Sequence, residues 1–443
     1  MSKLPIVAIV GRANVGKSSL FNRFMEKRQA IISDTPGTTR DAIYGKVHTE
    51  DRNFWLIDTA GLKIAEDDFE LSIQDQITQA TESADAIMVV IEHTVGITEE
   101  DRRVAKLALK SKKPVVLVVN KADNPKHDDI EPFRRLGIKD IFLTSAEHNR
   151  NLRVLSQHIS KLLPRVKDPN PETALRLSFI GRPNVGKSSL FNTLLAKQKA
   201  VVADLAGTTR DVNHQEIRYH SKTIELLDTA GIRRSGKVGT GIEYFSVLRA
   251  LAAIEESDVC CLVMDATELN TKLDQKIAGM IKDAGKGLIM VVTKWDLVDK
   301  DAYTRDDLAK DLSREFPFVP WAPLIFTSSE TGQNVSKLFD LALSIHERRL
   351  QKIATRDINR WLLEVSRHHP PAGLKNKHPN LTYMTQTGVS PPKFKVFGRD
   401  LKYLHWSYKR YMEKELRKYQ DFNGTPIEFE FESNSGNTKK HGN

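Results

Sequence analysis

Cysteine is almost absent from this sequence of 443 residues, which contains only the adjacent pair Cys260 and Cys261. The pair lies in the apolar run 259–264, and because neighbouring side chains of a strand point to opposite faces, a disulfide between them is not expected. The scarcity of cysteine excludes a scaffold that depends on disulfides. We expect two buried thiols in a reducing compartment.

The sequence also lacks any apolar stretch of the roughly 20 residues that span a bilayer. Its first residues, 1–5, lead directly into a short apolar run rather than into a signal peptide. We therefore expect a soluble, cytoplasmic protein with no membrane partner. No coiled-coil pattern or dimer stripe is present, so we expect a monomer.

Acidic residues are in deficit, and the formal net charge is +10. Residues 351–443 hold 17 Lys and Arg against 9 Asp and Glu, whereas the first 350 residues hold 50 against 48. Lys and Arg release condensed counterions from nucleic acid, so a basic excess in one segment indicates contact with a phosphate backbone. RNA is the polyanion that we expect.

What the sequence does contain is an internal repeat. Residues 11–41 and 181–211 are identical at 19 of 31 positions without a gap, with an offset of 170 residues. The two segments are therefore expected to be copies of one folding unit. Since a single core stops growing at roughly 250 to 300 residues, a chain of this length predicts two or three domains.

Each copy carries short apolar runs rich in β-branched residues and separated by helical patterns, which is typical of buried parallel strands with helical crossovers. The runs are 6–10, 54–57, 87–91 and 115–119 in the first copy, and 177–180, 224–227, 259–264 and 288–292 in the second. The predicted class is α/β, with two mostly parallel sheets that carry helices on both faces.

A phosphate-binding loop directly follows the first apolar run of each copy. The loops are Gly11, Arg12, Ala13, Asn14, Val15, Gly16, Lys17 and Ser18, and Gly181, Arg182, Pro183, Asn184, Val185, Gly186, Lys187 and Ser188. Backbone N–H groups of such a loop surround phosphates at a helix N-terminus, the lysine reaches the β and γ phosphates, and the serine faces magnesium. A chance Gly-rich turn is the alternative for one match, but two matches between a strand and a helix predict nucleotide binding.

A second motif follows the next run in each copy. It consists of Asp58, Thr59, Ala60 and Gly61, and of Asp228, Thr229, Ala230 and Gly231. The aspartate offers a carboxylate to magnesium, and the glycine N–H can approach the γ-phosphate. The next residues, Leu62 and Ile232, stand where Ras-like GTPases carry a water-orienting glutamine, and neither side chain can orient a water.

A Gly-Thr-Thr-Arg-Asp segment lies upstream of this motif in each copy. It offers Thr39 and Thr209 as further magnesium ligands. Together with the two phosphate-loop lysines, Lys17 and Lys187, these threonines are the candidate catalytic residues. An ordinary turn is the alternative for each segment, but it leaves the shared offset unexplained.

A base-reading motif follows a later run: Asn120, Lys121, Ala122 and Asp123 in the first copy, and Thr293, Lys294, Trp295 and Asp296 in the second. The aspartate accepts from N1 and the exocyclic amine of guanine, so GTP and GDP are favoured over adenine nucleotides. Threonine has no amide to donate, which makes the affinity of the second copy less certain. Ser145 and Ser328 mark the segments expected to offer a backbone N–H to the guanine oxygen.

The repeat and its flanks give the domain limits. We expect a first G domain at 1–167, a linker at 168–173, a second G domain at 174–350, a small α+β domain at 351–435 and a disordered basic tail at 436–443. The small domain is predicted to contain helices at 357–367 and 401–419 and strands at 381–387, 394–397 and 427–432.

The predicted helix 401–419 has two different faces. One gathers Leu404, Tyr408, Tyr411, Met412 and Tyr419 and is expected to pack on the small sheet. The other gathers Trp406, Lys409, Arg410, Lys414 and Arg417. This second face is either an RNA surface with Trp406 as a stacking platform or a seam against the G domains, and both alternatives stand.

With these motifs the chain resembles the Der (EngA) family, bacterial ribosome-assembly GTPases with tandem G domains that belong to the TrmE-Era-EngA-like group. The resemblance covers nearly the whole chain and implies a KH-like fold for residues 351–435, although no Gly-x-x-Gly clamp occurs after residue 350. It implies a GTPase that requires Mg²⁺ and acts on the large ribosomal subunit and its rRNA.

The resemblance further implies activation by K⁺, held in part by Asn14 and Asn184. The alternative is that these asparagines only bond the switch backbone. Two rival functions also remain open: G domains that gate a tRNA-modifying enzyme, for which no cofactor domain is evident, and a non-hydrolysing module in which nucleotide only stabilises the fold.

Overall fold

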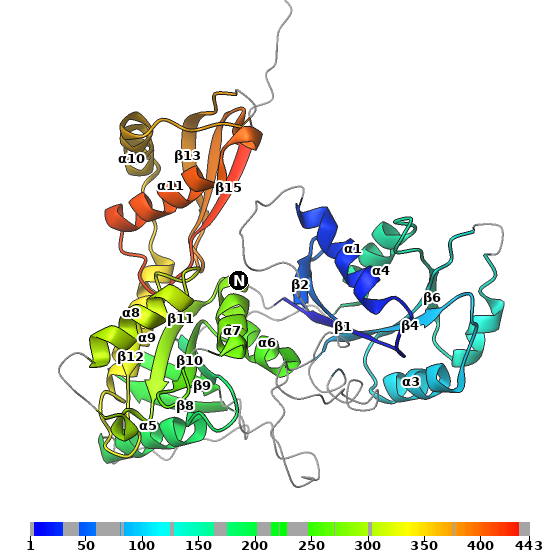
Figure 1. The fold of residues 1–443 in the computed structure, drawn as a ribbon, viewed down its shortest axis with the longest axis horizontal. Coiled ribbons are helices and arrows are strands. Elements are labelled where there is room, and N and C mark those ends of the chain that lie inside the picture. The colour runs from blue at the N-terminus through cyan, green and yellow to red at the C-terminus, as the bar shows by residue number, and fades with distance from the viewer. Residues whose placement is uncertain are drawn as a thin grey trace, which may run out of the picture. The chain divides into compact units, whose positions relative to one another are not determined.

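The structure is a computed structural model (Figure 1) that describes residues 4–29, 44–58, 80, 84–124, 128–163, 175–201, 214–220, 222–227, 247–269, 271–299, 304–374 and 377–433. The chain forms two compact units whose border falls at Pro169 and Asn170, and the second unit contains most of the residues from 170 to the C-terminus. The expected linker 168–173 and tail 436–443 lie outside the described residues.

The first copy forms a six-stranded sheet in the order β2-β3-β1-β4-β5-β6. All neighbouring strands are parallel except β2, which is antiparallel to β3. The strands are β1 Ile6–Val10, β2 Tyr44–Val47, β3 Phe54–Asp58, β4 Ala86–Glu92, β5 Val115–Asn120 and β6 Asp140–Leu143. The helices are α1 Lys17–Gln29, α3 Glu99–Lys110, the 3-10 helix η3 Glu131–Leu136 and α4 Leu152–Leu162.

The core of this copy follows from strands that are apolar on both faces. Leu20 and Phe21 of α1 and Leu155 and Ile159 of α4 pack on one face of the sheet, while α3 lies across the other face (Figure 1). Burial on both faces explains why β1, β3, β4 and β5 read as continuous apolar runs rather than as alternating ones. The prediction of an α/β fold is confirmed for this copy.

The second copy repeats the arrangement in the order β12-β11-β10-β7-β9-β8. Its strands are β7 Leu175–Ile180, β8 His214–Tyr219, β9 Lys222–Leu227, β10 Val259–Asp265, β11 Gly287–Thr293 and β12 Leu324–Phe326. Its helices are α5 Lys187–Val201, α6 Val247–Glu256, α7 Lys272–Asp283, the 3-10 helix η5 Trp295–Leu297, α8 Thr304–Glu315 and α9 Lys337–Leu350. The antiparallel edge strands β2 and β8 and the short edge strands β6 and β12 correspond to none of the apolar runs given above.

The two cysteines lie in β10 as expected. Both are free and fully buried, and only Cys261 joins the apolar cluster with α5 and α9. Burial raises the pKa of the Cys260 thiol to about 11, against hydrogen bonds with Ser178 and Ser257 that lower it. Burial also raises the pKa of Cys261. Both side chains are therefore neutral thiols at neutral pH.

The C-terminal domain has a three-stranded sheet in the order β13-β14-β15, with β14 antiparallel to β13 and parallel to β15. Its elements are α10 Thr355–His368, β13 Asn380–Gly388, β14 Lys393–Arg399, the 3-10 helix η6 Leu401–Tyr403, α11 Trp406–Tyr419 and β15 Glu428–Ser433. Ile358 and Leu362 of α10 and Met412 of α11 share a core with Met384 and Phe394 of the sheet. The predicted α+β domain is confirmed.

The prediction of one continuous helix from residue 401 is wrong. The chain forms a 3-10 turn at Leu401–Tyr403, and α11 begins only at Trp406. The intervening backbone bonds to the loop before β13: Leu374 N donates to Tyr403 O, and His405 N donates to Ala372 O. These bonds hold Leu404 in an extended conformation and break the helix there.

The expected apolar face of α11 is correct except at its end. Leu404, Tyr408 and Met412 are buried, and Tyr411 packs against the same core. Tyr419, however, is 47% exposed, whereas Leu416, which the sequence analysis left out, is fully buried. The last turn of the helix therefore presents Leu416 to the core.

The C-terminal domain joins the second copy through a seam that is largely buried. The Arg349 guanidinium is 1% exposed and donates to Gly285 O, to Thr425 Oγ1 and to Ser390 Oγ at 2.9, 3.2 and 3.1 Å. The main chain crosses the same seam, because Leu288 N of β11 donates to Gly424 O at 2.9 Å. Burial of the Arg349 cation lowers its pKa to about 10.

Among the described residues, no helix is long and apolar enough to cross a bilayer.

Candidate nucleotide-binding sites

The phosphate loop of the first copy connects β1 to α1. The Lys17 ammonium is buried and donates to Gly11 O at 2.8 Å and to Arg12 O at 2.6 Å, so the loop closes around its own lysine. Gly16 has φ +89°, and a Cβ on it would lie 2.3 Å from Asn120 Nδ2. Only glycine fits both that conformation and that contact.

The second copy has the same loop between β7 and α5. Lys187 Nζ donates to Gly181 O at 2.9 Å and also to Arg182 O. Asn14 and Asn184 both adopt a left-handed conformation, with φ of 64° and 61°. The two loops are thus built alike at the positions that the sequence analysis proposed to bind phosphate.

The base-reading motif of the first copy is tied to its phosphate loop. Asn120, the last residue of β5, is 2% exposed, and its Nδ2 donates to Val15 O at 3.0 Å. Its Oδ1 accepts from Ala146 N at 3.2 Å. One asparagine thereby connects the phosphate loop to the segment around Ser145, the segment expected to meet the guanine oxygen.

In the second copy, threonine makes the contact to the loop. The Thr293 hydroxyl is buried and donates to Val185 O at 2.5 Å, and it also lies 3.0 Å from Met264 O. Val185 occupies the position of Val15, so a hydroxyl replaces the amide at the equivalent carbonyl. The lack of an amide, which made this site doubtful from the sequence, does not leave the loop unsupported.

The lysine of each base-reading motif pairs with an acid that the sequence analysis missed. Lys121 and Lys294 both have positive φ, 62° and 54°. Lys121 Nζ lies 3.1 Å from Glu92, and Lys294 Nζ lies 2.5 Å from Asp265. A hydrogen bond from Thr94 and then one from Lys121 lower the pKa of Glu92. Each acid is the last residue of its strand, which is the signal that could have identified it.

The arginine of each phosphate loop lies near a crossover helix, α3 between β4 and β5 in the first copy and α7 between β10 and β11 in the second. Arg12 Nε lies 3.6 Å from Asp101 Oδ1 of α3, and Arg182 Nε lies 3.2 Å from Asp274 Oδ1 of α7. Both aspartates are fully buried and also close a capping box at the start of their helix. Burial raises the pKa of Asp274, against the nearby Arg182 charge that lowers it. These arginine side chains therefore hold helices in place beside the loop.

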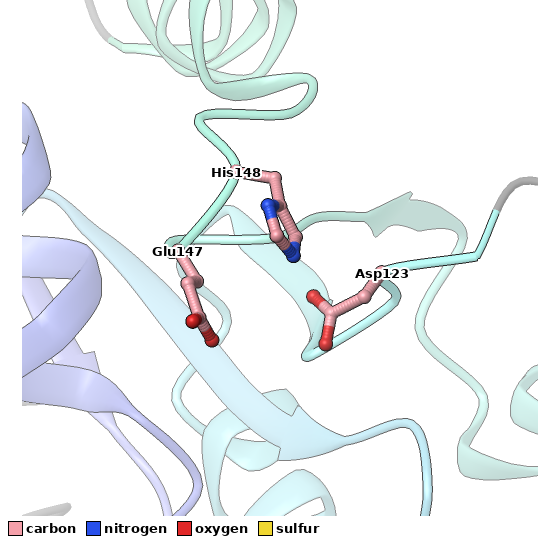
Figure 2. Close-up of side chains that lie close together, drawn as sticks. All are labelled: Asp123, Glu147 and His148. Atoms are coloured by element: carbon pink, nitrogen blue, oxygen red, sulfur yellow. The ribbon is translucent and has the colours of Figure 1, made fainter.

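Asp123, the expected guanine reader of the first copy, lies in an exposed group with Glu147 and His148 (Figure 2). The ligand atoms of the three side chains lie within 4.8 Å of one another, a spacing that could hold a metal ion, although exposed acidic groups are common without one. His148 N donates to Ser145 Oγ at 3.0 Å. The group therefore borders the expected base pocket, and we assign no metal to it.

The expected segments in the second copy meet in the same way. Trp295 N donates to Thr327 O at 3.1 Å, next to Ser328, whose hydroxyl accepts from Thr331 N. In the first copy the equivalent bond runs from Ala122 N to Thr144 O at 2.9 Å. Both copies therefore bring the base-reading motif beside the expected serine segment.

Two of the expected magnesium ligands of the first copy lie together. Ser18 Oγ donates to Asp58 Oδ2 at 2.6 Å, beside the phosphate loop. A hydroxyl and a carboxylate oxygen are ligands that suit a hard divalent cation, so these residues fit the group. In the second copy Ser188 lies at the start of α5.

Asp296, the expected guanine reader of the second copy, lies in η5, which begins directly after Lys294. Several further expected site residues lie outside the described part of the chain. They are Thr39, Thr59, Ala60, Gly61, Leu62, Thr209, Asp228, Thr229, Ala230, Gly231 and Ile232. Their roles stay predictions.

Comparisons with known proteins cover nearly the whole chain. A family model described as a 50S ribosome-binding GTPase matches residues 6–121 and again 176–294. A second, described as the KH-domain-like C-terminal domain of EngA bacterial GTPase enzymes, matches residues 352–432.

Many curated relatives carry the name GTPase Der, and three of them serve as examples. That of Chloroflexus aggregans is 44% identical over 440 residues, which cover 97% of this chain and 98% of the relative. That of Thermomicrobium roseum is 42% identical and covers 97% of this chain and 96% of the relative. That of Lactobacillus johnsonii is 41% identical and covers 96% of this chain and 98% of the relative.

Proposed function

The chain belongs to the GTPase Der family, and from that membership we propose that it acts as a nucleotide-switched factor in assembly of the large ribosomal subunit, in the cytoplasm and as a monomer. It binds GTP and hydrolyses it to GDP and phosphate. The observation that carries the proposal is the duplicated site, in which each phosphate loop bonds to its own base-reading strand, through Asn120 in one copy and Thr293 in the other.

Two sites with phosphate loops and base-reading motifs built alike favour a switch over a module that nucleotide merely stabilises. Each site combines a buried or half-buried lysine in the phosphate loop with a base-reading motif on the neighbouring strand. Binding of GTP orders switch loops around the γ-phosphate in GTPases of this class, which changes the surface offered to a partner. We propose that GTP and GDP states differ in their affinity for the ribosomal subunit for this reason.

P-loop GTPases use Mg²⁺, which neutralises charge on the β and γ phosphates when bound. We propose Ser18 and Asp58 as its ligands in the first copy, supported by the contact between their oxygens. Thr39, and Ser188, Thr209 and Asp228 of the second copy, are proposed for the same role. Lys17 and Lys187 supply a further fixed positive charge beside the phosphates.

We also propose activation by K⁺. Asn14 and Asn184 are exposed, and both adopt the left-handed conformation. Their side-chain oxygens are suited to a hard cation, and a cation there would stabilise charge that develops on the transferred phosphate. The proposal explains how hydrolysis proceeds although Leu62 and Ile232 replace the glutamine of Ras-like GTPases.

The C-terminal domain is the proposed contact with rRNA. The basic face of α11, expected to meet either RNA or the G domains, has residues of both kinds. Arg417 belongs to the seam: its guanidinium lies 5.6 Å from the Trp321 ring centroid and donates to Phe422 O at 2.8 Å. Trp406 is 36% exposed, with the Arg410 guanidinium 4.6 Å from its ring centroid. An exposed aromatic ring with a stacked cation suits contact with an unpaired base.

The test is GTP turnover in matched potassium and sodium buffers, for the intact chain and for Lys17→Ala and Lys187→Ala. Lys161→Ala, which changes an exposed lysine of α4, is the control. We expect stimulation by potassium that falls in part in each loop variant and not in the control. Equal rates in the two salts would refute the potassium proposal. Wild-type protein that fails to sediment with large ribosomal subunits in GTP would refute the assembly role.

A further inference from the structure

The first G domain has an open hollow of about 470 Å³ away from its nucleotide site. Its lining consists of Arg102, Lys106, Leu109, Lys110, Arg135 and Leu136. Four of these six side chains are cationic, and no acidic residue is among them. The hollow lies between α3 and η3, so two adjacent elements of the first copy supply all of its charge.

The cations of α3 form a single row. Arg102, Lys106 and Lys110 are spaced four residues apart, which places them on one face at intervals of about one turn, or roughly 6 Å. All three are exposed, as is Arg135 of η3. Like charges four residues apart destabilise a helix, so the row costs stability unless an anion offsets it.

Little within the described part of the protein neutralises this row. Arg102 pairs with Glu99 at 3.4 Å, but both side chains are well exposed, and such pairs contribute little. For Lys106, Lys110 and Arg135, the described part of the chain provides neither an ion pair nor a hydrogen bond to the side chain. The positive charge is therefore directed at solvent or at a partner.

The second copy shows that the G-domain fold does not require these charges. Helices α3 and α7 have equal length and begin with the same capping box, at Thr98 and Thr271. When they are aligned on that cap, the positions of the three α3 cations are occupied by Gln275, Gly279 and Asp283. The charge row is thus a property of the first copy alone.

The same face of α7 is used differently. Gln275 Nε2 donates to Glu315 at 3.3 Å, and Lys282 Nζ lies 5.9 Å from the Phe318 ring centroid. Residues from the end of α8 onward therefore cover this face in the second copy. In the first copy the shorter η3 leaves it open as the hollow.

We propose that the hollow between α3 and η3 binds an RNA phosphate backbone and is a second RNA contact, separate from the C-terminal domain. A row of three cations with a fourth alongside complements successive phosphates of one strand, and an open hollow can track a backbone that continues past it. The flexible lysines and the absence of an enclosing wall give no pocket for a base. The inference rests on the proposed ribosomal function, because that function supplies the RNA.

The test compares two variants of the full chain that lose equal charge. The hollow variant is Arg102→Gln, Lys106→Gln and Lys110→Gln together. The control is Arg103→Gln, Lys112→Asn and Lys161→Gln, which removes three exposed cations that do not line the hollow. Asparagine is chosen at Lys112 because that residue has φ +60°. Circular dichroism and thermal melting establish that both variants are folded.

Binding to a short labelled RNA duplex is measured by fluorescence anisotropy over a range of salt concentrations. Each lost phosphate contact lowers the slope of log K against log salt by about 0.7–0.9, so we expect the hollow variant to lose roughly 2–3 from the slope. The dissociation constant at low salt should rise by about tenfold or more, and the control should match the wild type.

Four outcomes decide the matter when sedimentation with large ribosomal subunits is measured in parallel. Weaker binding with a smaller slope in the hollow variant alone supports the inference. Equal behaviour of the two variants overturns it and leaves the proposed function standing. If wild-type protein sediments with subunits but does not bind the duplex, the inference is likewise overturned and the proposed function stands. Wild-type protein that binds neither overturns the inference and the proposed function together.

Discussion

The hydroxyl of Thr293 provides the sharpest test of how the second site is built. Thr293 is buried, and its hydroxyl donates to Val185 O of the phosphate loop at 2.5 Å. This hydrogen bond therefore supports the loop. Thr293→Val keeps the shape of the side chain but removes the donor. A buried carbonyl left without its partner costs about 1–3 kcal/mol. If that cost falls on the nucleotide-bound loop, GTP affinity should drop by about 5- to 150-fold.

The assay is titration with a fluorescent GTP analogue in a Lys17→Ala background, which weakens the first site and isolates the second. Thr293→Ser retains the hydroxyl and should bind nearly as the parent does. Thr293→Asn introduces the residue of the first copy and should also be tolerated, because Gly186 has no Cβ to obstruct a longer side chain. Equal affinity of the valine, serine and parent proteins would refute the reasoning, since the hydroxyl would then contribute nothing to the loop.

Three further outcomes are expected. Gly16→Ala should reduce GTP binding more than Gly186→Ala, measured by titration with the fluorescent analogue in a Lys187→Ala background for the first variant and a Lys17→Ala background for the second, because the added Cβ would lie 2.3 Å from an amide nitrogen in the first copy but 3.5 Å from a hydroxyl in the second; equal losses would contradict this. Arg349→Ala should lower the free energy of unfolding of its unit by about 2–4 kcal/mol, measured in urea, because a buried donor of three hydrogen bonds is lost. Arg349→Met should lower it less, and an unchanged urea midpoint would contradict a stabilising role for Arg349 in the seam. Both cysteines should resist alkylation at pH 7–8 until the protein is unfolded, because burial keeps the thiols protonated, with the pKa of the first at about 11; rapid labelling of native protein would contradict their burial.

The positions of the site motifs were predictable because an open parallel sheet binds ligands at the carboxyl ends of its strands. Gly11 and Asn120 each directly follow an apolar run that forms a strand in the structure, so residues in the same place after parallel strands of one sheet lie close together. The second copy confirmed the same relation independently. Fold class and the organisation of the site could both be read in this way.

Contacts between distant side chains were not predictable. Nothing local marks Thr293 as the support of Val185, which lies 108 residues earlier. The break before α11 arises from hydrogen bonds to the loop near Ala372. The spacing of apolar residues in the sequence carries no information about such bonds. The charge of the hollow was also not predictable from net charge. The three acidic residues at the start of α3 offset the basic row that begins at Arg102 when charge is summed over the segment.

The seam at Arg349 has a consequence for where this protein can be cut. A chain ending at residue 350 would carry every motif of the second G domain, yet Leu288 N would lose Gly424 O and the guanidinium would lose Thr425. Ile345, which packs around Gly424, would become exposed to water. The smallest autonomous piece that contains the second nucleotide site therefore extends to β15, and the border suggested by the motifs is not a border of independent stability.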